Sequence, residues 1–277
     1  MRVHHLNCGS FCPVGGRLFD GRSDGPTAHL VCHCLLIETD RGLVLVDTGY
    51  GMRDAARPDS RLATFFRMLN NPALRLEETA VAHVRRLGFD PADVRHIVLT
   101  HLDFDHAGGL EDFPNALVHV SAVERDAAEA RAGGSFIGQR RYRPCQWDDD
   151  VRFRTYPQAR GDGWFGFDAV RDLEGLPPEI LLIPLAGHSP GHCGIAVRDR
   201  DGWLLHAGDA YFHRGEVGGE RRECSPGLAA YQTLLEVDRG QRLRNQQRLR
   251  TLSNQQRGLV RMFCAHDPEE FEILAGT

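Results

Sequence analysis

The sequence predicts a single α/β domain. Short apolar runs typical of buried strands occur in both halves of the chain, and segments with helical spacing lie between several of them. A chain of 277 residues fits one large α/β domain or two small ones. Because no linker rich in Gly, Pro or Ser divides it, we assign residues 1–277 to one domain.

The first half of the chain alternates strand and helix patterns. Strands are predicted at residues 43–47, 97–99 and 116–120, and helices at residues 77–87 and 122–132. The strand at residues 43–47 ends in Asp47, directly before a Thr-Gly turn. Cys32 and Cys34 are two residues apart in a strand-like run, so they point to one face, and we expect them to be buried small apolar side chains.

Between about residues 135 and 175 the periodicity fails. Aromatic residues, Trp147 and Trp164 among them, are interspersed there with arginines. A long irregular segment inside a compact domain usually covers an active site or mediates contacts, so we expect this insert to cover the active site, with a homodimer contact as the alternative. The same composition occurs in proteins that bind single-stranded nucleic acid, but the acidic run at residues 148–150 argues against that reading.

The second half resumes the regular pattern. Strands are predicted at residues 180–184, 193–197, 203–206 and 260–265, and helices at residues 228–236 and 239–257. His188 lies on a loop between two of these apolar strands, whereas Asp209 and His266 come just after strand ends. A lone His in such a loop is usually structural. The motif Gly-His-Ser-Pro-Gly-His around His188 and the carboxylate of Asp209 soon after it favour a metal ligand instead.

Four side chains able to bind a metal lie within six positions after the strand at residues 97–99. They are His101, Asp103, Asp105 and His106. Imidazole and carboxylate groups bind first-row transition metals, and this spacing lets one turn aim several of them at a common point. Gly108 and Gly109 allow the backbone to pass close to them. A polar loop without a ligand role is the alternative, but loops more often place such residues singly.

With this stretch the chain resembles the metallo-β-lactamase superfamily, whose signature is His-x-His-x-Asp-His at the end of a strand. Asp103 stands here at the second His of that signature. Within the superfamily the chain is most similar to the quorum-quenching N-acyl-homoserine lactonases, because further motifs match in the same order. These are residues 33–39 leading into 45–49, Gly187-His188-Ser189-Pro190-Gly191-His192, Ala207-Gly208-Asp209-Ala210 and Cys264-Ala265-His266-Asp267.

The resemblance implies a four-layered αββα sandwich with a site for two divalent metal ions. It places His101, Asp103 and His188 around one metal, Asp105, His106 and His266 around the other, and Asp209 between them as a bridge. Two cations that share a water molecule lower its pKa, which supplies a nucleophile at neutral pH. The resemblance also implies a catalytic role for Asp105, which would orient this nucleophile, and a supporting role for Asp47 behind the ligands.

Two positions depart from the lactonase pattern. Lactonases carry a Tyr three positions after the bridging Asp, where this chain has Phe212, so Tyr211 is the candidate catalytic hydroxyl if the loop is shifted by one residue. Asp103 replaces an imidazole by a carboxylate, which is a harder donor. Zinc is the expected metal, and Asp103 makes manganese or iron the alternatives.

The sequence thus predicts a metal-dependent hydrolase that opens a lactone or small ester, with N-acyl-homoserine lactones as candidate substrates. An iron-dependent oxidoreductase of the same fold and a non-catalytic binding protein are the alternatives. The net charge of −5 argues against a nucleic-acid partner. No run approaches ~18 apolar residues and the N-terminus lacks the apolar core of a secretion signal, so we expect no membrane partner and a cytoplasmic location. The eight cysteines form no CxxC pair and would stay reduced there.

Overall fold

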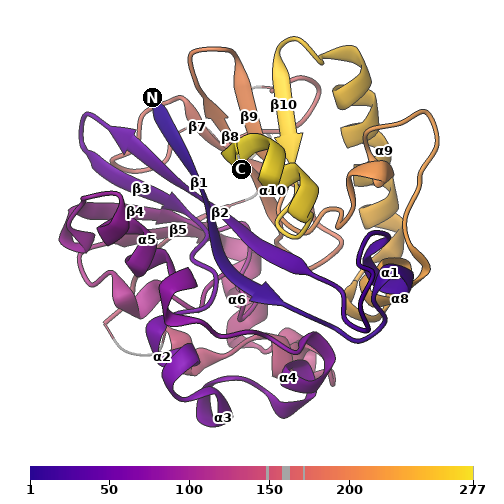
Figure 1. Cartoon of the computed structure of the whole chain (residues 1–277). Coiled ribbons are helices and arrows are strands. Elements are labelled where there is room, and N and C mark those ends of the chain that lie inside the picture. The colour runs from indigo at the N-terminus through magenta and orange to yellow at the C-terminus, as the bar shows by residue number, and fades with distance from the viewer. Residues whose placement is uncertain (148–149, 158–162, 171, 277) are drawn as a thin grey trace.

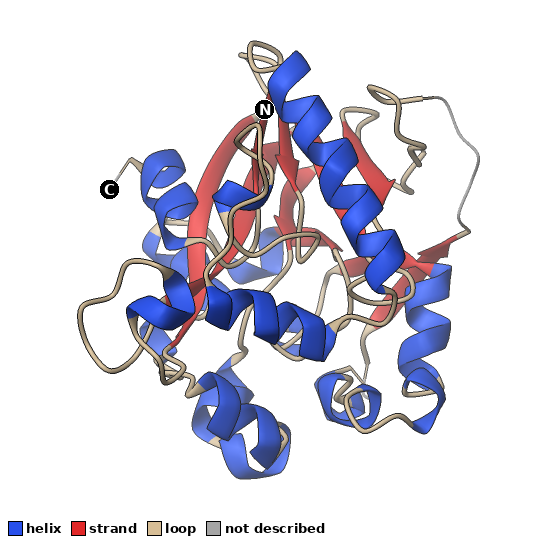
Figure 2. Ribbon diagram, turned by 90° about the vertical axis from the view of Figure 1, so that its right-hand side faces the viewer, coloured by secondary structure: helices blue, strands red, loops and turns tan. Residues whose placement is uncertain are grey.

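Two β-sheets pack face to face, and helices cover both outer faces. The computed structural model describes residues 1–147, 150–157, 163–170 and 172–276. In Figure 1, α5 lies beside one sheet and α9 beside the other, and Figure 2 shows the strands in the middle with helices around them. The α/β class and the four-layered αββα arrangement expected from the sequence are confirmed.

Within the described residues one sheet has six strands, in the order β1-β2-β3-β4-β5-β6, and the other has four, in the order β10-β9-β8-β7. The strands are β1 (Arg2–Phe11), β2 (Leu30–Thr39), β3 (Gly42–Val46), β4 (Val94–Val98), β5 (Leu117–Ser121), β6 (Arg152–Tyr156), β7 (Ile180–Pro184), β8 (Cys193–Arg198), β9 (Trp203–His206) and β10 (Val260–Phe263). The helices are α1 (Arg17–Asp20), α2 (Met52–Ala56), α3 (Pro58–Arg61), α4 (Thr64–Asn70), α5 (Ala80–Arg86), α6 (Ala122–Glu129), α7 (Gly138–Arg141), α8 (Pro226–Leu235), α9 (Arg239–Gln255) and α10 (Pro268–Ala275). No helix among these is long and apolar enough to cross a lipid bilayer.

The alternation of side chains along each strand builds the layers. Leu35 and Ile37 of β2 pack between the two sheets with Ile195 of β8. Leu36 points to the opposite face and packs with Val84 of α5. Since successive residues of a strand face opposite sides, an apolar run without alternation is what a sheet buried on both faces requires. The continuous apolar runs of the sequence are explained in this way.

Parallel strand pairs bring the ligand-bearing loops to one edge of the sandwich. β3 and β4 are parallel in the first sheet, and β9 and β10 are parallel in the second. His101, Asp209 and His266 each come three residues after the end of a strand, namely β4, β9 and β10. Because the carboxyl ends of parallel strands open at the same edge, these loops meet there.

The segment from about residue 135 to 175 is more regular than predicted. It contains α7 and the strand β6, which pairs in parallel with β5 at the edge of the six-stranded sheet. Arg152 and Arg154 of β6 are exposed, as is common for a charged edge strand, and this hid the apolar pattern of a strand. Residues 148–149, 158–162 and 171 lie outside the described residues, and the acidic run at residues 148–150 is therefore mostly not described.

The two tryptophans of this segment do not lie where we expected them. Trp147 is buried in the cluster that joins the six-stranded sheet to its helices. The Trp164 ring packs edge-on against Trp203, with ring centroids 5.7 Å apart, in the cluster that α9 covers. Both rings belong to the outer layers of the sandwich, so they do not form the predicted cover over the ligand group.

A candidate two-metal site at the strand ends

All seven side chains predicted to bind metal converge where the loops of the two sheets meet. The four imidazoles are between 0 and 2% exposed, and the three carboxylates are between 3 and 6% exposed. The seven residues are His101, Asp103, Asp105, His106, His188, Asp209 and His266. Burial of so many ionisable groups is costly unless they are paired or bind metal ions.

One half of this group surrounds a point with the spacing of a metal site. His188 Nε2 lies 3.1 Å from Asp103 Oδ2 and 3.3 Å from Asp209 Oδ2. His101 Nε2 lies 3.4 Å from Asp103 Oδ2. Ligand atoms about 2.0 to 2.2 Å from a tetrahedral zinc are roughly 3.4 Å from one another, which matches these distances.

The other half shares Asp209 through its second oxygen. Asp209 Oδ1 lies 3.1 Å from His266 Nε2 and 3.4 Å from His106 Nε2. His266 Nε2 in turn lies 3.9 Å from Asp105 Oδ2. Each oxygen of the Asp209 carboxylate therefore faces a different half of the group, which is the geometry of a bridging ligand.

Several of these donor atoms have no other use in the structure. His101 Nε2, His106 Nε2 and Asp209 Oδ1 are buried and have no hydrogen-bond partner among the described residues. A buried polar atom without a partner usually costs about 1–3 kcal/mol, so a cluster of three at one place indicates a missing partner rather than chance. Two divalent cations fit this donor set.

The opposite ring nitrogens are held from behind. His106 Nδ1 donates to Asp47 Oδ2 at 2.8 Å, and His266 Nδ1 donates to the Val31 carbonyl at 2.8 Å. His101 Nδ1 lies 2.9 Å from the Thr100 hydroxyl, which itself donates to Asp47 at 2.7 Å. These contacts fix the tautomer in which each Nε2 faces the site.

Asp47 has the supporting position that the resemblance implied. Besides the His106 ring it accepts the backbone N–H of Thr100 at 2.8 Å, and its own backbone has a positive φ of 55°. Burial works against the charged carboxylate, but the His106 ring, together with the rings of His206 and His101, outweighs it, and the pKa of Asp47 falls to about 2. Such backbone strain is common where a fold holds functional groups.

Glu124 of α6 is a supporting residue that sequence reasoning missed. Its Oε1 accepts the Leu102 N–H at 3.1 Å, and its Oε2 accepts the Ser189 hydroxyl at 2.6 Å and the Gly191 N–H at 3.0 Å. Its side chain is fully buried. Glu124 therefore ties the loop that carries His101 to the loop that carries His188.

Asp103, the residue that departs from the superfamily signature, is paired with a buried arginine. Arg141 Nε and Nη2 donate to the two oxygens of Asp103 at 2.7 and 2.6 Å. Burial alone would raise the pKa of Asp103, but the Arg141 guanidinium holds it well below the usual range. The sequence showed Arg141 only as one arginine of the insert between residues 135 and 175.

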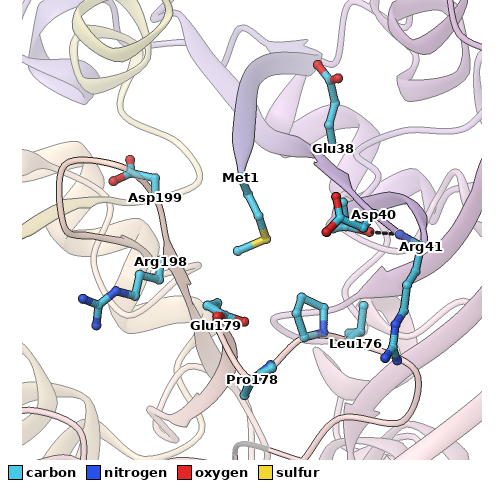
Figure 3. Close-up of a pocket in the computed structure, with 11 residues that line it drawn as sticks. Met1, Glu38, Asp40, Arg41, Leu176, Pro178, Glu179, Arg198 and Asp199 are labelled. Carbon is cyan, nitrogen blue, oxygen red and sulfur yellow. Dashed lines mark hydrogen bonds between the residues drawn. The ribbon is translucent and has the colours of Figure 1, made fainter.

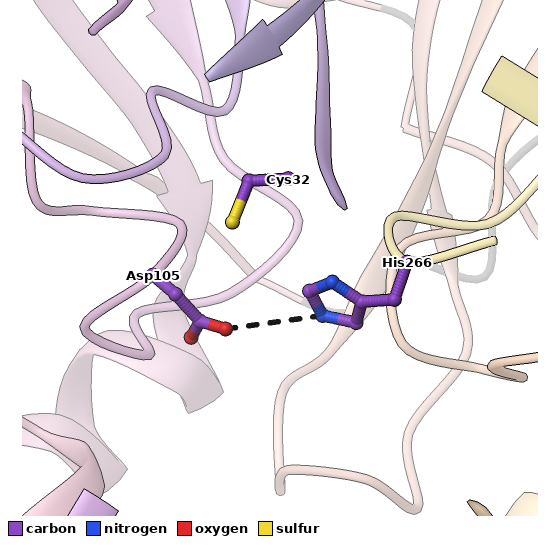
Figure 4. Close-up of side chains that lie close together, drawn as sticks. All are labelled: Cys32, Asp105 and His266. Carbon is purple, nitrogen blue, oxygen red and sulfur yellow. Dashed lines mark ion pairs between the residues drawn. The ribbon is translucent and has the colours of Figure 1, made fainter. Parts of the chain in front are cut away.

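Cys32 of β2 adds a further donor beside the second half of the group. Its Sγ, a carboxylate oxygen of Asp105 and a ring nitrogen of His266 all lie within 4.8 Å of one another, and Figure 4 shows the three side chains pointing toward one another. Burial, and next the charge of Asp105, raise the pKa of the Cys32 thiol. A thiol at this place can act as a ligand only where a cation lowers its pKa again.

Tyr211 does not reach the site. Its hydroxyl donates to Glu270 at 3.0 Å, and burial raises the pKa of that carboxyl to about 8. Phe212 takes the position beside the ligands instead, because its ring stacks on His266 with centroids 5.0 Å apart and planes 8° apart. The loop is therefore not shifted by one residue, and the geometry gives Tyr211 no contact with the reacting groups.

Two hollows differ in how close they come to the ligand group. One of about 570 Å³, drawn in Figure 3, is lined by Met1, Glu38 and Arg41 and lies at the end of β2 that is remote from Cys32. Another of about 490 Å³ is lined mainly by residues that lead into α7 and by residues at the end of α8, and it reaches Arg141. The second hollow approaches the ligand group, whereas the first does not.

Comparison with known proteins is consistent with this geometry. Residues 28–250 match the Metallo-beta-lactamase superfamily. A probable metallo-hydrolase of Mycobacterium tuberculosis is 38% identical over 277 residues, which cover all of this chain and 84% of the relative. An N-acyl homoserine lactonase of Bacillus cereus is 29% identical over 211 residues, 73% of this chain and 75% of the relative.

A solved structure has the same fold. An N-acyl homoserine lactone hydrolase with N-hexanoyl-L-homoserine bound at its catalytic metal centre has a TM-score of 0.71 to this chain. The alignment covers 98% of this chain and 95% of that chain at 23% sequence identity. At this sequence identity the match shows that the two proteins share a fold.

Proposed function

This chain belongs to the metallo-beta-lactamase superfamily, and from that premise we propose that it is a two-metal hydrolase that opens an acyl lactone or a related small ester. The observation that carries the proposal is the group of buried imidazole and carboxylate donors, three of whose atoms have no partner among the described residues. The lactonases among the relatives support the substrate class. Like those relatives, the chain is a metal-dependent hydrolase.

Each ligand residue has a distinct part in the proposed reaction. Two divalent cations would lower the pKa of a water molecule and polarise the substrate carbonyl. Asp209 turns one carboxylate oxygen toward each half of the site, and so links the two halves. Asp105 is the most exposed of the three carboxylates, at 6%, which suits it to orient the attacking water and accept its proton.

The donor set favours zinc. Four of the ligands are imidazoles, and the Cys32 thiol lies beside Asp105 and His266. Nitrogen and sulfur donors suit zinc better than manganese, which prefers carboxylate and water. Manganese and iron remain alternatives because of Asp103, and measurement of the metal content decides between them.

An aromatic wall beside the ligands suits the apolar part of an acyl substrate. Its members share one buried cluster with Cys32, and they are Phe11, Tyr50, Phe66, Phe104, Phe212 and Tyr231. The Tyr231 hydroxyl donates to Asn70 Oδ1 at 2.9 Å, whereas the Tyr50 hydroxyl and Asn70 Nδ2 have no partner among the described residues. We propose that these polar groups orient the amide or ring oxygen of the substrate, because a few polar contacts fix the orientation of a ligand that is otherwise held by apolar groups.

The test is a substrate panel with the metal-loaded protein. Acyl lactones of several chain lengths, aryl esters, phosphodiesters, thioesters and β-lactams are compared, and opening of a lactone is followed through the proton that the new acid releases. We expect turnover of at least one acyl lactone and its loss in Asp209→Ala. If every lactone stays intact while another compound is cleaved, the substrate class is wrong although the hydrolase assignment stands.

A further inference from the structure

Every N–H of the Arg141 guanidinium has an acceptor. Nε and Nη2 donate to the two oxygens of Asp103, and Nη2 also donates to His188 Nε2 at 2.5 Å. Nη1 donates to the carbonyls of His188 at 3.0 Å and of Leu235 at 3.2 Å. A guanidinium carries five donors in a fixed plane, so five acceptors in matching positions describe a built site. Arg141 is only 1% exposed.

The guanidinium lies at the rim of the ligand group rather than at its centre. Arg141 pairs with Asp103, but none of the ion pairs between described residues joins it to Asp209 within 4.0 Å. A group at the centre would be close to all four donors, including His101 and Asp209. The guanidinium therefore occupies the outer edge formed by Asp103 and His188, and leaves the space between the donors to a cation.

The charges of Asp103 and Arg141 balance. The superfamily signature has a neutral His where this chain has the charged Asp103. The full positive charge of Arg141 lies in bidentate contact with that carboxylate, so the two residues together carry no net charge. The remaining carboxylates of the ligand group are Asp105 and Asp209.

We propose that Asp103 and Arg141 work as one neutral ligand unit, in which Arg141 is a positioning residue that sets the metal affinity of this half of the site. The proposal rests on the proposed two-metal function and deepens it. Arg141 orients Asp103 so that one oxygen faces the cation, and it cancels the extra charge that a carboxylate brings to this position.

Metal binding then requires a small rearrangement at His188. The lone pair of its Nε2 accepts from Arg141 Nη2, and the same lone pair must turn to a cation on binding. The contact of Nε with Asp103 and the contacts of Nη1 with the two carbonyls do not involve that lone pair, so they can persist. Lysine has neither the plane nor the number of donors to replace these contacts.

The proposal makes an unusual prediction for the substitution that restores the superfamily signature. Asp103→His alone leaves the Arg141 charge buried without a partner beside the cation, so we expect its metal affinity to fall about 10–100-fold, as for other residues that support ligands. Asp103→His combined with Arg141→Met removes both charges together. We expect this double variant to recover most of the affinity that the single variant loses.

The experiment measures metal content after dialysis, and metal affinity by competition with a chelating dye. It compares the unmodified protein, Asp103→His, Arg141→Met and the double variant. Arg61→Met is the matched control, because Arg61 is also a buried arginine paired with a carboxylate, that of Asp54 at 3.1 Å. It should leave the metal content unchanged. Thermal unfolding in the presence of a chelator shows separately whether each variant folds.

The outcomes separate this inference from the proposed function. Fewer than two metals in the unmodified protein after loading contradict the two-metal function, and the unfolding data still test the pairing. Asp103→His that binds metal as tightly as the unmodified protein overturns the inference. The inference is also overturned if the double variant binds metal no better than Asp103→His, or if neither variant folds. A double variant that binds metal more tightly than Asp103→His, or that folds where Asp103→His does not, supports the inference.

Discussion

Substitution of Glu124 by Gln should damage stability and metal binding together. Glu124 accepts four hydrogen bonds, two at each oxygen, from Leu102, Tyr142, Ser189 and Gly191. A Gln side chain keeps one oxygen and presents an NH2 group in place of the other. The hydroxyls of Tyr142 and Ser189 can rotate to accept from that group, but the backbone N–H on the same side cannot.

The size of the effect follows from this count. One buried N–H without an acceptor costs about 1–3 kcal/mol, and each remaining bond loses the extra strength of an ionised acceptor, roughly 1 kcal/mol. These terms add up to about 4–6 kcal/mol, but a neutral Gln also removes the desolvation cost of a buried charge, so a net loss of about 3 kcal/mol is expected. For 277 residues the entropy of unfolding is on the order of 0.6 kcal/mol/K, so the melting temperature should fall by about 5 °C. Metal affinity should fall about 10–100-fold, because both ligand loops lose their common anchor.

The assay compares Glu124→Gln with Glu129→Gln, which changes an exposed residue of the same helix. Thermal unfolding is followed by circular dichroism with and without metal, and bound metal is measured after dialysis. The control should stay within about 0.5 kcal/mol of the unmodified protein. A Glu124→Gln variant that melts with the control and keeps its metal would refute the role assigned to Glu124.

Three further predictions concern the ligands and their neighbours. Asp209→Ala should release at least one metal and abolish nearly all turnover, because the bridge serves both halves of the site, and unchanged metal content would reject the bridge. Tyr211→Phe should change turnover less than about 3-fold while it lowers stability by about 1–3 kcal/mol, because its hydroxyl bonds the half-buried Glu270, and a large loss of turnover at unchanged stability would instead return Tyr211 to the reaction. Cobalt-loaded protein should show a sulfur-to-cobalt charge-transfer absorption that Cys32→Ala removes and Cys34→Ala leaves, and its persistence in Cys32→Ala would exclude the thiol as a ligand.

The ligand residues could be predicted because their signal is local. His101 to His106 lie in one turn after a strand, and the other ligands sit in short motifs after or between strands. Parallel pairing then brings strand ends to one edge, so that sequence position translates directly into spatial position. The same locality explains why most strands were predicted within one or two residues. The long first strand, β1, was not predicted, because its polar and small residues hide the apolar alternation of a strand.

The supporting residues could not be predicted, because they act across long separations in the sequence. Arg141 is 38 residues from Asp103, and Glu124 is 65 residues from Ser189. Neither stands in a recognisable motif, since a single Arg or Glu on a helix is usually solvated. Only the packing of α6 and α7 against the ligand loops gives these side chains their role.

Phe212 and Tyr211 illustrate a different limit. A shift of one residue in a loop decides which of two neighbouring aromatic rings faces the site, and the sequence allows both. The structure decides through two contacts, the stack of Phe212 on His266 and the bond from Tyr211 to Glu270. Tyr50 and Tyr231 supply hydroxyls within the aromatic wall, whereas Tyr211, in the loop that carries Asp209, does not belong to it.

The interpretation of Asp103 changes most when its partner is known. Taken alone, a carboxylate at this position adds a negative charge and favours a harder metal than zinc. A unit charge about 5 Å from a divalent cation interacts with it by roughly 7 kcal/mol at an effective dielectric constant of 20, before solvation is counted. The opposite charge on Arg141, held on the same carboxylate, offsets part of the attraction between Asp103 and the cation. The departure from the superfamily signature is thus offset within this chain, because Asp103 and Arg141 together carry the same net charge as the neutral His of that signature.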